Sequence, residues 1–286
     1  NIFLPEKRAF FLENSDLFSD FGIPSIRPFY SRTIGLDKDG NKIPILFGAR
    51  LSGNIAPGTR IGAMDMQTGR QGAYSPENFS AITIQKRVLK RSQLKGYFLN
   101  RENYITAEEE KKNPLDRYGR NAGAAFEYTN ADGTFNSWAT YHQSFKEHIN
   151  TLDSYVEGGF ASNTKHWSWI TEIGNVGKNY YTDMGFVQRI NNYDAVRDTT
   201  IRMGYKNIYL NGSYKRNPDK GIIGRMEAGI NSSINFNPDN SFNEANNSLN
   251  LSADFKNTAG LRINLSNTQL NLLFPISFTD GNPLPA

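Results

Sequence analysis

The chain has no cysteine, which excludes disulfide frameworks, thiol catalysis and zinc sites with cysteine ligands. No stretch approaches the roughly 18 consecutive apolar residues that a membrane-spanning helix needs, so a helical membrane protein is excluded. Glycine-rich phosphate-binding loops and the Gly-x-Ser-x-Gly sequence of serine hydrolases are also missing. The common catalytic classes therefore find no support in sequence motifs.

Apolar residues are scarce for a compact enzyme, at 38% of 286 residues with a mean hydropathy of −0.57. Aromatic residues make up 13%, and side chains of that size need burial or an interface, so the composition is not that of a disordered chain. The net charge is +4 and the charges are dispersed, which argues against a nucleic-acid partner. What remains is an all-β chain that is polar on average.

Turn sequences divide the chain after residue 42 into strand-like stretches. A charged insertion at 105–117 interrupts one hairpin. We expect about twelve to fourteen strands in all. The clearest predicted strands are 43–53, 58–68, 79–90, 93–103, 120–130, 133–145, 153–163, 165–175, 182–192, 197–215, 221–237, 244–257 and 259–275.

These stretches are long and alternate between apolar and polar residues. Leu249, Leu251 and Ala253, for example, alternate with Asn250 and Ser252, which gives one apolar and one polar face. Such lengths exceed the ordinary mode of about 5–6 residues and fit the roughly 9–11 of a transmembrane strand. The pattern favours an antiparallel up-and-down transmembrane β-barrel. A soluble sandwich or propeller, with the apolar face buried against protein, stays open.

Aromatic residues gather at predicted strand ends, as the girdle of a membrane barrel requires. An alternative is that Trp138, Trp167 and Trp169 stack on sugars, although an aromatic belt explains them more simply. The girdle candidates are Trp167, Trp169, Tyr180, Tyr181, Tyr205, Tyr209 and Tyr214.

Residues 1–42 differ from the rest, with several prolines and a helix-compatible patch from Glu6 to Phe18. The stretch from Pro5 to Phe18, PEKRAFFLENSDLF, resembles the signature of a bacterial outer-membrane β-barrel family of uncharacterised function. Its signature positions here are Pro5, Glu6, Lys7, Arg8, Phe10, Phe11 and Glu13. Further similar stretches are FYSRTIGL at 29–36, IPILFGARLSG at 43–53, IGAMDMQT at 61–68 and FPIS at 274–277.

The resemblance implies location and fold rather than activity. It implies the outer membrane of a Gram-negative bacterium, with residues 1–42 as a plug or periplasmic-mouth segment and 43–286 as barrel strands. The family usually carries a carbohydrate-binding-family-9-like domain before the barrel, which this sequence lacks, and Asn14 replaces an expected glycine. The sequence also lacks a terminal aromatic strand, so we expect it to be an interior portion of a longer protein.

Three groups of residues carry side chains that are candidates for chemistry. His142, His148 and His166 have no metal-ligand spacing and are expected to be solvated or girdle residues. Glu6, Lys7, Arg8 and Glu13 are expected to form ion pairs that hold the helical segment, rather than to join Asp16 in acid–base catalysis. Arg87, Lys90, Arg91, Lys95 and Arg101 fit solvated loop charge, contacts to lipid or lipopolysaccharide phosphates, or a lumen lining for anionic solutes.

Three functional hypotheses follow. The first is a porin-like passive pore or a barrel subunit of an envelope complex, with no covalent chemistry, catalytic residue, metal or cofactor. Its partners would be outer-membrane lipid, lipopolysaccharide and other envelope proteins; the sequence identifies no ligand-binding residue. The second is a glycan-binding or glycan-processing surface protein, and the third a soluble periplasmic β-sandwich.

Overall fold

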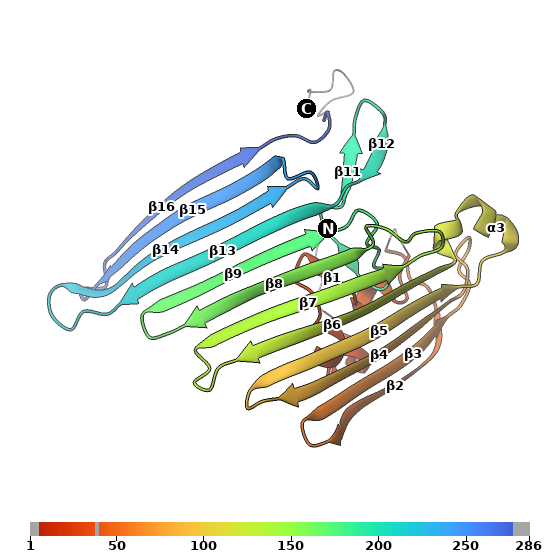
Figure 1. Ribbon diagram of the computed structural model, residues 1–286, viewed down its shortest axis with the longest axis horizontal. Helices are drawn as coiled ribbons and strands as arrows, with labels where there is room; N and C mark the ends of the chain where they lie inside the picture. Colours follow the sequence, from red (N-terminus) through yellow and green to blue (C-terminus); the bar gives the residue numbers. More distant parts are fainter. Residues whose placement is uncertain (1–5, 38–39, 277–286) are drawn as a thin grey trace. The chain divides into compact units, whose positions relative to one another are not determined.

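The computed structural model describes residues 6–37 and 40–276. It is an all-β structure built on a large antiparallel sheet, as predicted (Figure 1). The strands of this sheet are β2 (Ile45–Ala56), β3 (Thr59–Thr68), β4 (Glu77–Val88), β5 (Ser92–Asn103), β6 (Tyr118–Thr129), β7 (Phe135–Phe145), β8 (Ser154–Asn163), β9 (Trp167–Val176), β13 (Tyr205–Arg216), β14 (Ile223–Phe236), β15 (Phe242–Phe255) and β16 (Gly260–Leu270).

The twelve strands follow the order β16-β15-β14-β13-β9-β8-β7-β6-β5-β4-β3-β2, so each strand lies beside the next large strand along the chain. This is the up-and-down order that the turn sequences predict. The terminal strands β2 and β16 are not paired with each other within the residues that the structure describes. Across those residues, no helix is long and apolar enough to cross a membrane.

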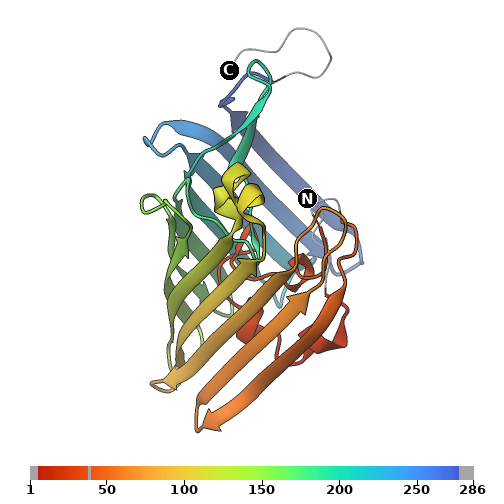
Figure 2. The same cartoon turned by 90° about the vertical axis from the view of Figure 1, so that its right-hand side faces the viewer.

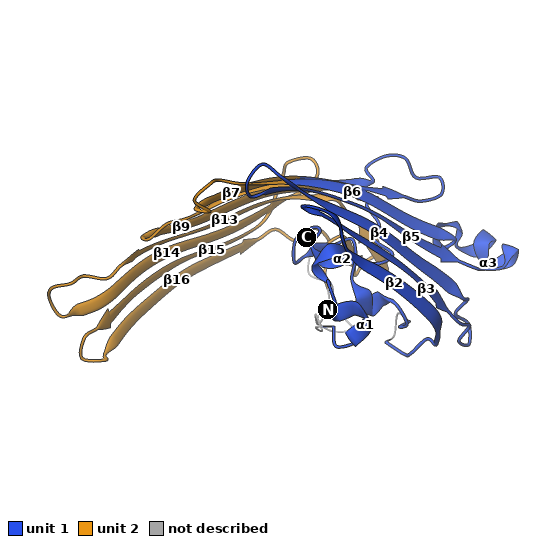
Figure 3. Ribbon diagram, turned by 90° about the horizontal axis from the view of Figure 1, so that it is seen from below, with its two compact units in different colours: residues 1–126, 140–155, 179–188 blue, residues 127–139, 156–178, 189–286 orange. Residues whose placement is uncertain are grey.

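Two compact units make up the chain (Figure 3). Unit 1 comprises residues 1–126, 140–155 and 179–188, and unit 2 comprises 127–139, 156–178 and 189–286. Unit 1 contains the N-terminal segment, which we define as residues 6–36, and the strands β2 to β5. Unit 2 contains β9 and β13 to β16.

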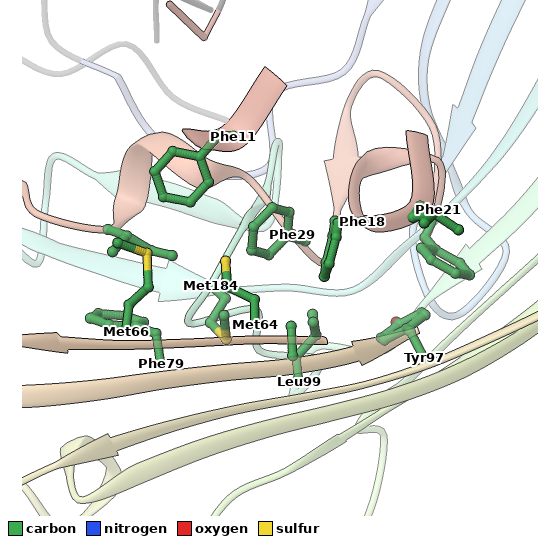
Figure 4. Packing of buried hydrophobic residues seen from close by; sticks show 13 residues of the cluster. Phe11, Phe18, Phe21, Phe29, Met64, Met66, Phe79, Tyr97, Leu99 and Met184 are labelled. Carbon is green, nitrogen blue, oxygen red and sulfur yellow. The ribbon is translucent and has the colours of Figure 1, made fainter. Parts of the chain in front are cut away.

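The N-terminal segment packs on one face of β3, β4 and β5 in unit 1. It contains the short helices α1 (Ala9–Leu12) and α2 (Asp16–Ser19), the strand β1 (Ile26–Arg27) and the 3₁₀ turn η1 (Ser31–Thr33). Phe11, Phe18 and Phe29 point toward the strands, where they meet Met64 and Leu99 (Figure 4). The predicted helical patch is therefore two short helices, and their apolar side chains form the core of unit 1.

The opposite face of the same strands carries exposed aliphatic residues. Ile82 and Ile84 alternate along β4 with the buried Phe79, Ala81 and Thr83. Because successive side chains on a strand point to opposite faces, the N-terminal segment covers one face and leaves the aliphatic face uncovered.

In unit 2 the strand register separates two faces cleanly. Leu249 lies opposite Ile230 on one side and Leu265 on the other, whereas Asn250 lies opposite Gly229 and Asn264. The aliphatic row is exposed, with Leu265 at 59%. The alternation predicted for 244–257 is confirmed.

Two predicted elements differ from the structure. Residues 182–192 were expected to form a long strand, but they contain only β10 (Phe186–Val187), paired with β1, and the start of β11 (Asn191–Asp194). The backbone carbonyl of Met184 accepts hydrogen bonds from the backbone N–H of Tyr30 and the hydroxyl of Thr33, which ties this stretch to the N-terminal segment. The alternation of apolar and polar residues along 182–192 therefore does not indicate one long strand paired in a sheet.

The predicted strand 197–215 is divided into β12 (Thr199–Arg202), which pairs with β11, and β13. The charged insertion 105–117 forms the helix α3 (Ala107–Lys112) and the 3₁₀ turn η2 (Pro114–Asp116), at the ends of β5 and β6 (Figure 2). Helix α3 starts with a capping box in which Thr106 and Glu109 satisfy each other's backbone N–H groups.

Candidate functional site

A cavity of about 940 Å³ lies in unit 1, where β4 begins and β5 ends. Its wall also includes residues from the N-terminal segment, from α3 and η2, and from the stretch 181–188. A volume in the range of roughly 300–1,000 Å³ is typical of small-molecule sites. This cavity is the candidate functional site.

Arg101 at the end of β5 is the centre of a charged cluster in the cavity wall. Its guanidinium donates to Glu77 (Nε–Oε1 2.9 Å), Asp116 (Nη2–Oδ1 2.9 Å) and Asp183 (Nη1–Oδ2 3.2 Å). Arg101 faces Glu77 because β4 and β5 form a hairpin in which Glu77 lies opposite Asn103. The five N–H donors of arginine suit it to hold several carboxylates at once.

Lys146, which follows β7, completes this cluster. Its ammonium donates to the backbone carbonyl of Leu115 (2.7 Å) and forms an ion pair with Asp183. Burial lowers the pKa of Lys146, and the Asp183 carboxylate opposes that shift. Residue 119, beside Asp183, has to be glycine, because a Cβ there would lie 2.1 Å from Asp183 Oδ2.

The cluster is thus two cations and three carboxylates that satisfy one another. Removing one member of such a network is costly, because it leaves the others without a compensating charge. Together these side chains join the strand ends, the insertion after β5 and the stretch 181–188 around one cavity.

Two of the residues on which the sequence resemblance rests, Glu6 and Arg8, form a separate clasp in the N-terminal segment. Glu6 accepts hydrogen bonds from Arg8 (Nε, 3.0 Å) and from the Ser31 hydroxyl (2.6 Å), and Arg8 donates to the carbonyls of Ser31 and Ile34. Arg8 also stacks on the buried Phe11 ring, at 4.3 Å from its centroid. The clasp therefore closes the N-terminal segment on itself between residues 6 and 34.

The other residues on which the sequence resemblance rests contribute less to the clasp. Phe10 is partly exposed, Lys7 is exposed, and the carbonyls of Phe10 and Glu13 accept hydrogen bonds from Arg50. Of the ion pairs predicted among Glu6, Lys7, Arg8 and Glu13, the pair between Glu6 and Arg8 is present. Asp16, which was not part of that prediction, pairs with Arg60 of β3. Pro5 lies outside the described residues.

The pKa values of the clasp predict acid sensitivity. Burial would raise the pKa of the Glu6 carboxyl, but hydrogen bonds from Arg8 and Ser31 lower it from 4.5 to about 2. Because the folded-state pKa is depressed, its stabilisation is complete above pH 4.5 and is lost as the pH falls toward 2. We therefore expect protease cleavage within residues 6–36 to accelerate across this window.

The variant Glu6→Gln tests the cause. It should weaken the clasp at neutral pH and flatten the pH dependence of cleavage. Some dependence should persist, because a hydrogen bond from Arg60 also lowers the pKa of Asp16. An unchanged pH profile in Glu6→Gln would contradict this assignment.

The expectation of solvated or girdle histidines is wrong for His142, which is completely buried. Its ring stacks between Tyr97 and Tyr155, and Nδ1 lies 2.8 Å from the Tyr97 hydroxyl. The inner face expected to be wet is covered here by the aromatic ring of Phe21, which packs on Tyr97. His148 and His166 are exposed, as expected.

The basic residues predicted near the membrane edge divide into two groups. Arg87, Lys90 and Arg91 are exposed around the turn between β4 and β5. Lys95 and Arg101 are buried, Lys95 in an ion pair with Asp20. For these two, contact with lipid phosphates is a wrong expectation, because they point to the covered face of β5.

The aromatic residues proposed for a girdle also fall into two groups, one on the aliphatic face of the sheet and one buried. Trp167 and Trp169 share the face of Ile173, where Trp167 packs against Tyr214 at 4.7 Å and Trp169 covers Gly212. Tyr180 is completely buried in unit 1, so the girdle expectation is wrong for it. Trp138 donates to the buried Glu157 (2.8 Å) and is not in an exposed belt.

Within residues 6–37 and 40–276 there is no group of three or more histidine and carboxylate residues that could hold a metal ion. No protein-family model, curated protein or solved structure matches the chain.

Proposed function

We propose that the chain is part of an outer-membrane β-barrel of a Gram-negative bacterium and performs no covalent chemistry. The observation that carries this proposal is the two-faced sheet of unit 2. One face has exposed rows such as Ile230, Leu249 and Leu265, and the other has Gly229, Asn250 and Asn264. An aliphatic outer face and a polar inner face are the arrangement of a barrel wall in lipid.

A soluble sandwich would bury the aliphatic face beneath a second layer. In the described part of unit 2, exposed aliphatic residues lie on the neighbouring strands β9 and β13 to β16, among them Ile173, Ile208, Met226, Leu251 and Ile263. Such a surface costs free energy in water at about 25 cal/mol per Å², a cost that lipid removes. Trp167, Trp169 and Tyr214 on that face suit the membrane–water boundary.

The connections between strands suggest an orientation. The turns between β2 and β3 and between β4 and β5 are short, whereas β5 and β6 are joined by residues 104–117 and β9 and β13 by residues 177–204. Outer-membrane barrels have short periplasmic turns and longer extracellular loops. Arg87, Lys90 and Arg91 would then meet phospholipid headgroups of the inner leaflet, and lipopolysaccharide would contact the opposite end.

Between the two roles left open by the sequence, a barrel subunit of an envelope complex fits better than a passive pore. The N-terminal segment covers the inner face of β3 to β5 with Phe18, Phe21 and Phe29, which does not suit free diffusion of solutes along these strands. The passive pore remains the second candidate because the inner face of unit 2 is rich in asparagine and serine.

Single cysteines test the lipid contact directly, since the native chain has none. Leu251→Cys and Asn250→Cys are a matched pair, adjacent on β15 and on opposite faces. Each is labelled with an environment-sensitive fluorophore in full-length protein reconstituted into vesicles that contain brominated lipid. We expect strong quenching at residue 251 and little at residue 250.

Equal quenching at both positions, or none at either, would contradict the membrane proposal. A soluble sandwich predicts a buried label at residue 251 and no association with vesicles. Unboiled protein from outer membranes should also migrate differently from boiled protein on a detergent gel. Conductance across a planar bilayer would favour the passive pore.

A further inference from the structure

Two polar atoms in the wall of the cavity in unit 1 have no hydrogen-bond partner in the protein. They are the hydroxyl of Ser75 and the side-chain carbonyl oxygen of Asn103, in residues only 6% and 8% exposed. Buried polar atoms are nearly always paired, so two such atoms in one cavity indicate a missing partner. Both belong to neighbouring strand ends, because Asn103 lies opposite Glu77, two residues after Ser75.

The chemistry of these atoms limits the ligand. One N–H of the Asn103 side-chain amide is used, since Nδ2 donates to Asp116 Oδ2 at 3.3 Å. The unpaired amide oxygen is an acceptor, so the ligand must bring a donor. The Ser75 hydroxyl can donate or accept. A hydroxyl group on a ligand can pair with either atom, because it both donates and accepts.

The charges in the wall do not favour an ionic ligand. Arg101 is shared by Glu77, Asp116 and Asp183, and Lys146 is held by Asp183 and the Leu115 carbonyl. The whole lining has four basic and five acidic side chains, which nearly cancel. Neither a phosphate nor a strong cation would find an unshared counter-charge in this cluster.

Aromatic rings supply the remaining surface. Tyr30, Tyr74, Tyr181 and Phe186 line the same cavity, and Tyr30 meets Phe186 edge to face at 5.5 Å. Aromatic rings pack on the C–H faces of a ligand, and the polar atoms beside them bind its hydroxyl groups. The cavity therefore matches molecules that have both features. We propose that the cavity binds a neutral saccharide, with Ser75 and Asn103 as its polar contacts.

The test measures binding of maltotriose, cellotriose and N-acetylchitotriose to the full chain in detergent micelles by titration calorimetry. Trigalacturonate is the anionic counter-probe. We expect at least one neutral trisaccharide to bind, and Ser75→Ala and Asn103→Ala each to weaken it about tenfold or more. The matched controls Ser80→Ala and Asn100→Ala, on the same hairpin but on its other face, should bind like the native protein.

A third variant guards against loss of folding. Ala73→Trp places an indole at an exposed position of the cavity wall without changing either unpaired atom. It should abolish binding and leave the melting temperature unchanged. Binding retained in Ala73→Trp, or in Ser75→Ala combined with Asn103→Ala, would overturn the proposal.

Two results with the native protein would also overturn it. One is no binding of any of the three neutral trisaccharides up to about 10 mM. The other is a preference for trigalacturonate. The saccharide contacts do not depend on the proposed membrane location, so the labels at residues 250 and 251 distinguish the failure of one proposal from that of the other.

Discussion

Replacing Arg101 with methionine is expected to lower the free energy of unfolding of unit 1 by about 3–5 kcal/mol. Methionine fills a similar volume but leaves Glu77, Asp116 and Asp183 without the cation they share. The Arg101 side chain is only 11% exposed, and removing one partner of a largely buried ion-pair network leaves the remaining charges uncompensated. Denaturant unfolding of the full chain in micelles, followed by tyrosine fluorescence, measures the loss.

Arg120→Met is the matched control. Arg120 forms an exposed pair with Glu102 at 3.5 Å, and such surface pairs contribute about 0–1 kcal/mol. Combining Arg101→Met with Glu77→Gln should restore part of the lost stability, because one uncompensated carboxylate is removed. Equal losses for Arg101→Met and Arg120→Met would show that the buried cluster does not hold the cavity wall together.

The strands of this chain could be predicted because their faces have different environments. The predicted strand 93–103 is β5 (Ser92–Asn103), and 79–90 is β4 (Glu77–Val88). In both, alternation of side chains reports directly on which face is covered. Where the chain leaves the sheet, as at Asp183 and Met184, the same alternation has another origin, and the predicted strand 182–192 is wrong.

The candidate site was not visible in the sequence because its parts come from five separate stretches. Ser75 precedes β4, Asn103 ends β5, Asp116 belongs to the insertion, and Lys146 and Asp183 follow later. The hairpin register could have placed Arg101 near Glu77. Nothing in local patterning brings Lys146 or Asp183 to the same place, since that depends on packing of the stretch 181–188 against the N-terminal segment.

His142 also shows what prediction from the sequence cannot reach, here for the burial of a single side chain. Its place within a strand was predicted correctly, and a polar residue on the inner face of a barrel is ordinarily wet. The ring is nevertheless buried between Tyr97 and Tyr155, because the N-terminal segment covers that region. A polar position on a strand therefore indicates a face, but only tertiary contacts decide whether water reaches it.

We expect Phe18 to contribute most to holding the N-terminal segment on the strands β3 to β5. It is 3% exposed, packs 6.0 Å from Phe29, and lies beneath the Arg50 guanidinium at 4.6 Å. Strand β3 makes room for it at Gly62, where a Cβ would lie 2.7 Å from the ring. Phe18→Ala should therefore cost about 3–5 kcal/mol in the free energy that keeps the segment bound.

Phe10→Ala provides the comparison, because Phe10 has the same chemistry but is 37% exposed and should cost far less. Chymotrypsin cleavage within residues 6–36 of the full chain measures release of the segment, and heat-modifiability of the remainder reports on the sheet. From the strand side, Gly62→Ala should also release the segment, whereas Gly53→Ala meets no atom within 4 Å and should not. If Phe18→Ala and Gly62→Ala leave cleavage at the rate of their controls, the segment is not held by this core.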